Sequence, residues 1–339
     1  MVILLKVGVV IVGAGRMGSI HASNIRRIPR AELLAIVDPD MARAKQLGET
    51  YGIAYYTELE TALKAHSGRL KAVVIASPLT AHLENIMVAS EYGLDIFVEK
   101  PMAPSLSECK EIVRIVRSKG IKLQVGYQRR FDRNYLEVKK LLSNSQIGKI
   151  LMVKFIARDP MPEPGAGLGR EYRGALFDDM ITHEFDLVSW LLGFPPERLA
   201  AFGATLYFNI EDYDNALINI EFRGGPIVNI EATRCSVYGH DLRLEILGTE
   251  GLIKMENTPE TQVYFYGKHG SSRMPRLPWF AERFSNAYYM EMESFIDAIA
   301  RDENPLPNEE DGLRACILSE AAKRSALEGR IVMISEILG

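Results

Sequence analysis

The stretch KVGVVIVGAGRMGSI, residues 6–20, decides the fold of this chain. Its first part, residues 6–12, is rich in valine and predicts a buried strand, whereas residues 16–28 predict a helix. Between them lies Gly13-Ala14-Gly15-Arg16-Met17-Gly18, which has the spacing G-x-G-x-x-G. Where this spacing follows a strand and opens a helix, it is typical of a turn that binds a dinucleotide.

Each glycine of this turn has a physical task. Gly13 permits the tight turn, Gly15 lets the backbone approach a pyrophosphate, and Gly18 lets the helix pack on the strand. The N-terminus of the helix then offers N–H groups and the positive end of its dipole to the phosphates. The residues expected to bind the phosphates are Gly13, Ala14, Gly15, Arg16 and Met17. The alternative is a glycine-rich turn without a cofactor, and a carboxylate farther along the chain argues against it.

That carboxylate is Asp38, twenty residues after Gly18 and at the end of the next apolar run. A carboxylate at this place accepts hydrogen bonds from the adenosine ribose hydroxyls and repels a 2′-phosphate. The sequence therefore predicts that the cofactor is NAD rather than NADP.

The first third of the chain continues as short apolar runs that alternate with helical segments. This alternation predicts βαβ units and a parallel sheet. Parallel strands are covered on both faces, so they are apolar throughout, as these are. We therefore expect residues 1–126 to form an NAD-binding Rossmann domain. The expected strands are 6–12, 33–38, 71–77, 94–98 and 121–126, and the expected helices are 16–28, 40–51, 81–92 and 105–118.

The pattern changes after residue 126. Longer strands follow, joined by turn signals such as Arg223-Gly224-Gly225 and Thr249-Glu250-Gly251, which predict hairpins. We expect residues 127–339 to form an α+β domain with a large, mostly antiparallel sheet. The expected strands are 149–158, 197–209, 214–222, 226–235, 241–247 and 261–266, and the expected helices are 133–143, 178–192, 286–301 and 309–328.

Composition excludes several other classes of protein. The 339 residues are 47% hydrophobic and 25% charged, which is ordinary globular usage and excludes wholesale disorder. A net charge of −4 argues against a surface for nucleic acid or an anionic membrane. No apolar run reaches the length of a membrane span, and a cleaved signal at residues 1–12 would remove the strand before the glycine turn.

The cysteines and histidines predict neither disulfides nor a metal site. Cys109, Cys235 and Cys316 are few and far apart, so a reduced, cytoplasmic setting is expected. No group of ligands has the spacing of a zinc site. His66 and His269 lie in polar segments and are expected in solvent, whereas His21 is expected to be structural or near the phosphates. These expectations are drawn from the sequence context of each side chain.

Lys100 is the first candidate for chemistry. It follows the strand 94–98 directly, within Glu99-Lys100-Pro101. Ligands of open parallel sheets bind beyond the carboxyl ends of the strands. A lysine there can hydrogen-bond a substrate hydroxyl and stabilise the negative charge that develops on its oxygen. The alternative is a solvated lysine in a turn.

Asp179 and His183 are the second candidate. They are four residues apart on the expected helix 178–192, so their side chains are neighbours on one face. A histidine held by a carboxylate is suited to act as a general base near neutral pH. The alternative is a solvated polar face, because Asp186 and Trp190 extend the same stripe. Glu184 falls within the apolar arc, which suggests a buried, paired carboxylate.

Taken together, these residues resemble the glucose-fructose oxidoreductase and inositol 2-dehydrogenase (Gfo/Idh/MocA) family, over nearly the whole chain. Within the family the resemblance is strongest to inositol 2-dehydrogenases. The motifs that carry it are GAGRMG, Asp38, Ser77-Pro78-x-x-x-His82, Glu99-Lys100-Pro101, Gly126-Tyr127-Gln128-Arg129-Arg130-Phe131-Asp132, Arg158-Asp159-Pro160, Asp179-x-x-x-His183-Glu184-x-Asp186 and Cys235-x-x-Tyr238-Gly239-x-Asp241.

The resemblance implies roles for individual residues. The implied catalytic set is Lys100, Asp179 and His183. The implied further cofactor contacts are Ser77, Pro78, His82, Glu99, Lys100 and Gln128. The implied substrate contacts are Lys100, Arg129, Asp159, Asp179, His183, Tyr238 and His240. Three features depart from the usual inositol dehydrogenase pattern, namely Asp159, His240 and the loop 161–173, and all lie where substrate would be recognised.

The resemblance implies an NAD-dependent dehydrogenase that oxidises a secondary hydroxyl of a cyclitol or related polyol to a ketone. It also implies a homodimer or homotetramer assembled through the open sheet, with no nucleic-acid or membrane partner. Three alternatives stay open at this point. They are a sugar or nucleotide-sugar dehydrogenase of the same family, a non-catalytic NAD- or sugar-sensing regulatory module, and an NAD-dependent glycosidase.

Overall fold

The computed structural model describes residues 6–161, 174–193, 195–257, 263–268, 270–273 and 279–339. These residues form two compact units. The first combines the chain up to Phe131 with residues 286–316, and the second combines Asp132–Ser285 with residues 317–339. The domain boundary expected at residue 126 places residues 286–316 in the second domain. In the structure, this segment belongs to the first unit.

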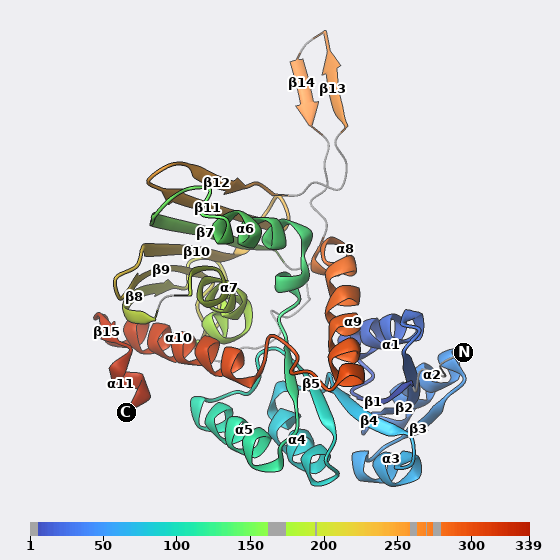
Figure 1. The fold of residues 1–339 in the computed structure, drawn as a ribbon. Helices are drawn as coiled ribbons and strands as arrows, with labels where there is room; N and C mark the ends of the chain where they lie inside the picture. Colours follow the sequence, from blue (N-terminus) through green and yellow to red (C-terminus); the bar gives the residue numbers. More distant parts are fainter. Residues whose placement is uncertain (1–5, 162–173, 194, 258–262, 269, 274–278) are drawn as a thin grey trace. The chain divides into compact units, whose positions relative to one another are not determined.

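The first unit is built on a six-stranded parallel sheet (Figure 1). The strand order is β3-β2-β1-β4-β5-β6. The chain first adds strands on one side of β1 and then on the other side, as in a Rossmann fold. The expected fold class is confirmed for this half. The strands are β1 Val7–Val12, β2 Ala31–Val37, β3 Ala54–Tyr56, β4 Leu70–Ile75, β5 Asp95–Glu99 and β6 Leu123–Gly126. The helices between them are α1 Arg16–Arg27, α2 Met41–Tyr51, α3 Leu59–His66, α4 His82–Glu91 and α5 Leu106–Lys119.

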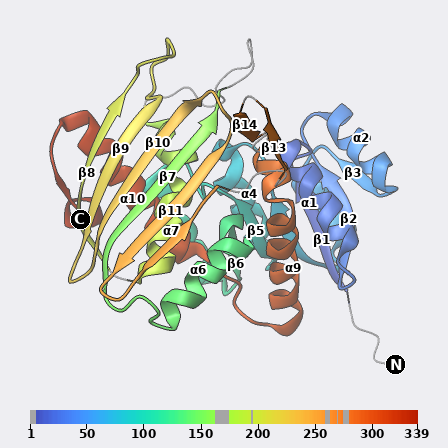
Figure 2. The same cartoon turned by 90° about the horizontal axis from the view of Figure 1, so that it is seen from above.

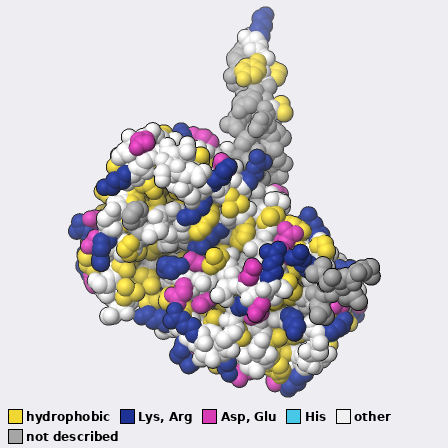
Figure 3. Space-filling view, in the orientation of Figure 1, with side chains coloured by type: hydrophobic (Ala, Val, Ile, Leu, Met, Phe, Trp, Pro, Cys, Tyr) yellow, Lys and Arg dark blue, Asp and Glu magenta, His cyan; other side chains and the backbone are white. Residues whose placement is uncertain are grey.

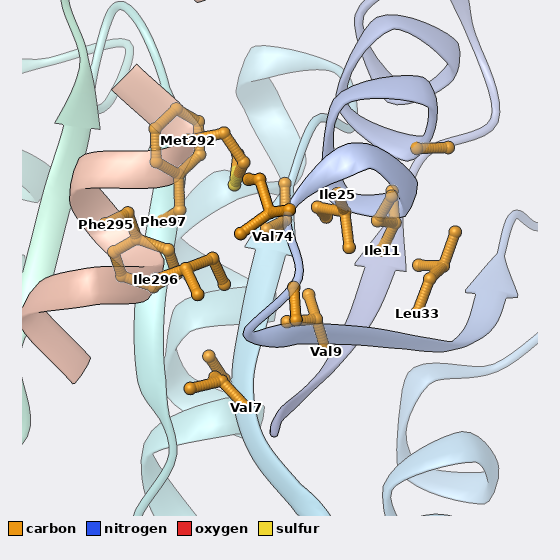
Figure 4. Packing of buried hydrophobic residues seen from close by; sticks show 14 of the residues in the cluster. Val7, Val9, Ile11, Ile25, Leu33, Val74, Phe97, Met292, Phe295 and Ile296 are labelled. Atoms are coloured by element: carbon orange, nitrogen blue, oxygen red, sulfur yellow. The ribbon is translucent and has the colours of Figure 1, made fainter. Parts of the chain in front are cut away.

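Helix α9, Ser285–Arg301, completes the core of the first unit. Its side chains Met292, Phe295 and Ile296 pack against Val74 and Phe97 of the sheet, as Figure 4 shows. All five side chains are fully buried. An apolar sheet face must be covered, and here the cover comes from a helix far along the chain.

The second unit is built on a seven-stranded sheet with the order β12-β11-β7-β10-β9-β8-β15. β7 and β10 are parallel and the remaining neighbours are antiparallel, so the expected antiparallel sheet is confirmed in the main. The strands are β7 Ile150–Pro160, β8 Pro196–Ala204, β9 Asn215–Phe222, β10 Ile227–Ser236, β11 Asp241–Gly248, β12 Leu252–Met255 and β15 Val332–Met333.

One face of this sheet carries helices α6, Arg133–Ser143, and α7, Thr182–Leu192, while the strands lie side by side in front of them in Figure 2. Buried and exposed residues alternate along β9 and β10, which is the pattern of a sheet covered on one face only. The opposite face is therefore open in the single chain.

A two-stranded hairpin, β13 Tyr264–Gly267 and β14 Gly270–Arg273, belongs to the second unit but joins neither sheet. Figure 3 shows hydrophobic side chains standing on it, and Val263, Phe265 and Tyr266 are exposed. The chain then continues through α8 Phe280–Arg283 and α9 to α10 Glu309–Glu328 and α11 Ser335–Leu338.

Several elements differ from the expectation. The strand expected over 197–209 ends at Ala204. The carboxylate of Asp214 accepts the N–H groups of Leu206, Tyr207 and Phe208, so the chain turns there instead of extending. The edge strands β3 and β15 have only three and two residues, which is too short for a periodic signal.

Within the described residues, no helix is both long enough and apolar enough to cross a membrane.

Candidate active site

The glycine turn after β1 has the geometry that its motif predicts. Gly13 has a φ of +102°, and a Cβ there would lie 2.4 Å from the carbonyl oxygen of Ala76. A Cβ at Gly18 would lie 1.8 Å from the carbonyl oxygen of Gly13. Both positions therefore exclude any larger residue, because the clashing atoms belong to the backbone.

Gly15 has a different environment. Leaving out its chain neighbours, no described heavy atom lies within 4 Å of the place that a Cβ would take. Gly15 is also the N-cap of α1, and no side chain caps this end of the helix. The space beside Gly15 at the start of α1 is thus open among the described residues, and the turn fits the pyrophosphate of a dinucleotide.

Asp38 is buried beside this turn. Its Oδ2 accepts the N–H of Ala14 at 2.8 Å, and its Oδ1 accepts the N–H of Asp40 at 2.9 Å. Asp38 therefore holds the glycine turn in place while it presents negative charge at the end of β2. Asp40 adds a second carboxylate as the N-cap of α2. This pair of charges suits ribose hydroxyls and disfavours a 2′-phosphate.

The residues after β4 lie beside the glycine turn, because β4 is the neighbour of β1 at the point where the strand order reverses. Ser77 and Pro78 follow β4, and the side chain of Asn85 donates to Ser77 Oγ at 3.1 Å. His82 was expected to contact the cofactor, but it is 1% exposed. Its ring nitrogens lie 3.1 Å from the Ser77 carbonyl oxygen and 3.2 Å from that of Pro101. This places His82 as a brace between two loops.

Lys100 stands directly after β5, where the motif predicts. It is half-buried, and its N–H donates to its neighbour Glu99 at 3.2 Å. Gln128 and Arg129 belong to the short turn 128–131 after β6 and are both buried. The first unit therefore brings Glu99, Lys100 and these two residues to the carboxyl ends of adjacent strands, β5 and β6.

The expected helix 178–192 is interrupted. Residues 176–180 form a π-helical turn, and the α-helix α7 begins only at Thr182. Asp179 lies in the π turn and His183 in the first turn of α7, so simple α-helical spacing does not relate their side chains. Single π turns are frequent at functional sites, because the wider turn re-aims side chains.

The polar stripe of this segment is not a solvated face. His183 is 6% exposed and Asp186 is 1% exposed. Burying such polar groups costs free energy unless they are bound, and both take part in interactions. The alternative of a solvated Asp–His face is therefore wrong.

The structure also separates two adjacent aspartates. Asp178 accepts the hydroxyl of Ser319 at 2.5 Å and the ammonium of Lys323 at 3.1 Å, both on α10. Lys323 is partly desolvated, yet the charge of Asp178 helps to hold the pKa of Lys323 above its usual value. Asp178 thus anchors the π turn, which leaves Asp179 as the candidate for chemistry.

Asp212 is a buried residue beside the π turn that the sequence reasoning missed. It is fully buried and accepts the N–H groups of Gly174 at 2.7 Å and Leu176 at 2.9 Å. Arg234 donates to the same carboxylate at 2.8 Å. Asp212 thus fixes the entry of the π turn that carries Asp179. Nothing in a single sequence distinguishes it from a loop aspartate.

The expected substrate residues of the second unit form two groups. His240 Nε2 lies 3.5 Å from Asp159 Oδ1, and the Trp279 ring packs edge-on against His240. Tyr238 is half exposed, and its hydroxyl donates to Asp241 at 2.8 Å and accepts from Arg158. Of the loop 161–173, all but the first residue lies outside the described residues. No group of side chains in the described ranges could hold a metal ion.

Comparison with known proteins places this geometry in a family. Residues 7–127 match the model of the Gfo/Idh/MocA oxidoreductase family, NAD-binding Rossmann fold. Residues 139–334 match the model of its C-terminal alpha/beta domain. Both expected halves are therefore matched by models of one family.

Individual relatives agree over the full length. The chain is 31% identical to myo-inositol 2-dehydrogenase of Thermotoga maritima, over 99% of this chain and 100% of that one. It is 33% identical to scyllo-inositol 2-dehydrogenase (NAD(+)) of Bacillus subtilis, over 96% and 95% of the two chains.

A solved structure is similar as well. Scyllo-inositol dehydrogenase from Lactobacillus casei, with bound NAD(H) and scyllo-inositol, superposes with a TM-score of 0.88 at 25% identity, covering 97% of this chain and 99% of that one. The glycine turn, the two sheets and these full-length matches agree, and the chain belongs to the Gfo/Idh/MocA family of NAD-binding oxidoreductases.

Proposed function

We propose that this protein is an NAD-dependent dehydrogenase that oxidises a secondary hydroxyl of an inositol or a related cyclitol to a ketone. The observation that carries the proposal is the full-length similarity to myo- and scyllo-inositol 2-dehydrogenases. It is supported by the uncapped, open glycine turn with Asp38 beside it, which fits the cofactor.

In this proposal three side chains act on the substrate. His183 accepts the proton of the hydroxyl, Lys100 donates a hydrogen bond to the same oxygen, and Asp179 orients His183. Bound NAD supplies the acceptor for the hydride. The role of the chain is to position the hydroxyl and to stabilise the negative charge on its oxygen as the proton leaves.

Substrate recognition is assigned to Arg129, to the Asp159–His240 pair and to Tyr238. Cyclitols offer a ring of hydroxyls, each of which both donates and accepts a hydrogen bond. A carboxylate, an imidazole and a phenol provide complementary groups. The loop 161–173 is proposed to set the choice among substrates.

The experiment that tests the function follows NADH formation with a panel of inositols, aldoses and nucleotide-sugars. We expect turnover with at least one inositol at higher kcat/KM than with any aldose or nucleotide-sugar. A preference for a sugar would favour the sugar dehydrogenase alternative. Binding of NAD without turnover of any member of the panel would favour a regulatory module, and bond cleavage without net NADH would indicate a glycosidase.

We also infer a cytoplasmic enzyme, because Cys109, Cys235 and Cys316 are all free thiols.

A first prediction concerns the cofactor. Asp38→Ser combined with Pro39→Arg should narrow the preference for NAD over NADP in kcat/KM by about tenfold or more, since a charged acceptor of hydrogen bonds is lost. NAD affinity should fall as well, because Asp38 also holds Ala14. Glu32→Gln, which removes a carboxylate of strand β2 that is paired with Arg69, should leave the preference unchanged. Equal use of both cofactors by the wild-type protein would contradict the role of Asp38.

We propose that the protein is a homo-oligomer that assembles through the open sheet face. The strand register aligns Leu247, Met152 and Ile227 across β11, β7 and β10, and all three are about half exposed. Phe202 and Leu217 form a second exposed pair across β8 and β9. Apolar groups of this kind on a monomer surface mark protein contacts.

A second prediction tests this interface. Met152→Glu combined with Phe202→Glu should convert the oligomer to a monomer of 38.0 kDa in light scattering, because a charge would be buried in each apolar group. The matched control is Met87→Glu on α4, where a similarly exposed methionine lies outside the face. A wild-type protein that is monomeric at micromolar concentration would contradict the proposed homo-oligomer.

A further inference from the structure

A buried pair, His21 and Glu99, lies inside the first unit next to Lys100. His21 Nε2 and Glu99 Oε1 are 2.6 Å apart, although 78 residues separate them in sequence. His21 is fully buried and Glu99 is 7% exposed. A carboxylate oxygen only accepts, so Nε2 is the nitrogen that donates. A hydrogen bond to a carboxylate in a buried site is strong and directional.

The second oxygen of Glu99 faces the other way. Its Oε2 accepts the N–H of Lys100 at 3.2 Å, so the carboxylate folds back over the end of its own strand. One oxygen of Glu99 therefore accepts a hydrogen bond from His21 on α1, and the other accepts one from the backbone of Lys100. Glu99 is also expected among the cofactor contacts, and this expectation stays a prediction.

The surroundings leave the carboxylate little freedom. A Cβ on Gly126 of β6 would lie 3.1 Å from Glu99 Oε2, so a larger residue there would press on this oxygen. The Phe97 ring packs edge-on against His21 at 5.0 Å between centroids, and the Tyr288 ring does so at 6.3 Å. Residues of three elements, β5, β6 and α9, thus enclose the pair.

Tyr288 shows the electrostatic character of this enclosure. Burial, together with the negative charges of Glu99 and Glu291, raises the pKa of Tyr288 well above its usual value. Its hydroxyl accepts a hydrogen bond from the side chain of Gln128 at 3.0 Å. The phenol therefore stays neutral, and it adds no negative charge beside Glu99.

A pair that only filled the core would not need to be polar. Apolar side chains of similar volume replace buried ionic pairs at little or no loss of stability. Two further facts favour a functional task. The pair joins α1, whose N-terminus carries the glycine turn, to the strand end that carries Lys100. In the described part of the chain, His21 Nδ1 has no hydrogen-bond partner, so among these residues the ring is hydrogen-bonded only through Nε2, to Glu99.

We propose that His21 is a positioning residue for the reaction. Through the carboxylate of Glu99, it holds the backbone of Lys100 where the lysine side chain can reach a substrate oxygen. This proposal rests on the role of Lys100 in the proposed function. Because Lys100 must meet a substrate oxygen within hydrogen-bond distance, a shift of its backbone by a fraction of an ångström weakens that contact. The glycine turn itself needs neither side chain, so NAD affinity should not depend on the pair.

The main experiment replaces the pair by apolar residues of similar size, in His21→Leu combined with Glu99→Met. We expect the variant to keep its melting temperature and its Kd for NAD, measured by fluorescence quenching, and to lose about 10–100-fold in kcat. His21→Gln, whose amide N–H can donate to Glu99, should restore most of kcat. A double variant with wild-type kcat would overturn the proposal, because the pair would then be structural only.

A second variant keeps the proposal testable if the double variant does not fold. Gly126→Ala removes no partner and only presses a methyl group on Glu99 Oε2. It should lower kcat by several-fold with an unchanged Kd for NAD, and an unchanged kcat would count against the proposal. The matched control is Arg30→Gln with Asp297→Asn. It removes an ion pair between the turn that follows α1 and helix α9, and it should leave kcat unchanged.

A readout that does not need turnover separates this proposal from the proposed function. If the wild-type protein oxidises no inositol, the proposed function fails, but the reactivity of the Lys100 amine can still be measured. Acetylation by an activated acetate ester, followed by peptide mass spectrometry, should proceed at Lys100 at a changed rate in the double variant. The rate at the exposed Lys119 should not change. Identical rates at Lys100 in both proteins would overturn the positioning role.

Discussion

Replacing His183 by alanine is expected to lower kcat by about 10²–10⁴-fold, the range typical for the loss of a general base. His183 is buried at the start of α7, immediately after the π turn that carries Asp179. Without the imidazole, no positioned group takes the hydroxyl proton. The affinity for NAD, measured by fluorescence quenching, should survive, because the glycine turn and Asp38 belong to the other unit.

Two further variants make this test specific. Asp179→Asn should reduce kcat less than His183→Ala, because it disturbs the orientation of the imidazole but leaves the base in place. The two effects should not add, since the residues act as one unit. His66→Ala is the matched histidine control, because His66 lies on α3 and bonds only to Tyr56 among the contacts described for it. If His183→Ala keeps more than about a tenth of wild-type kcat, the assignment of His183 as general base fails.

Lys100→Met should cost about 10²–10³-fold in kcat, as does the removal of one donor from an oxyanion site. The methionine keeps the length and packing of the side chain but removes the ammonium group. The substrate oxygen then gains negative charge without a nearby cation. Because the N–H of Lys100 still reaches Glu99, the backbone of the loop should be unchanged. Steady-state kinetics with a saturating cofactor measure the effect.

The charge and the geometry of Lys100 can be separated. Lys100→Arg keeps a cation but places it farther out on a planar group, so it should recover only part of kcat. The control is Lys119→Met at the end of α5, which removes an exposed ion pair with Glu91 and should leave kcat near wild type. A Lys100→Met enzyme with wild-type kcat would return Lys100 to the status of a solvated turn residue.

The sequence by itself determined the parts of this protein that depend on local signals. The apolar run 6–12, the glycine spacing and Asp38 predict a strand, a turn and a carboxylate whose relation is fixed within about thirty residues. The hairpins at Gly224 and Gly251 follow in the same way, because a turn is encoded by the residues that make it. Residue-specific motifs also selected Lys100, Asp179 and His183, whose roles stay predictions.

Only the tertiary structure decided which polar groups are bound to which. The sequence could not show that Asp178 anchors α10 and Asp212 braces the π turn, nor that His21 meets Glu99. These partners lie 36 to 141 residues apart in sequence, and no helical or strand period relates them. Periodicity reports which side of an element is buried, whereas the choice of a hydrogen-bond partner depends on how distant elements pack. For this reason periodicity left a solvated helix face open as the alternative for residues 178–192, whereas the fold contains a largely buried, interrupted helix.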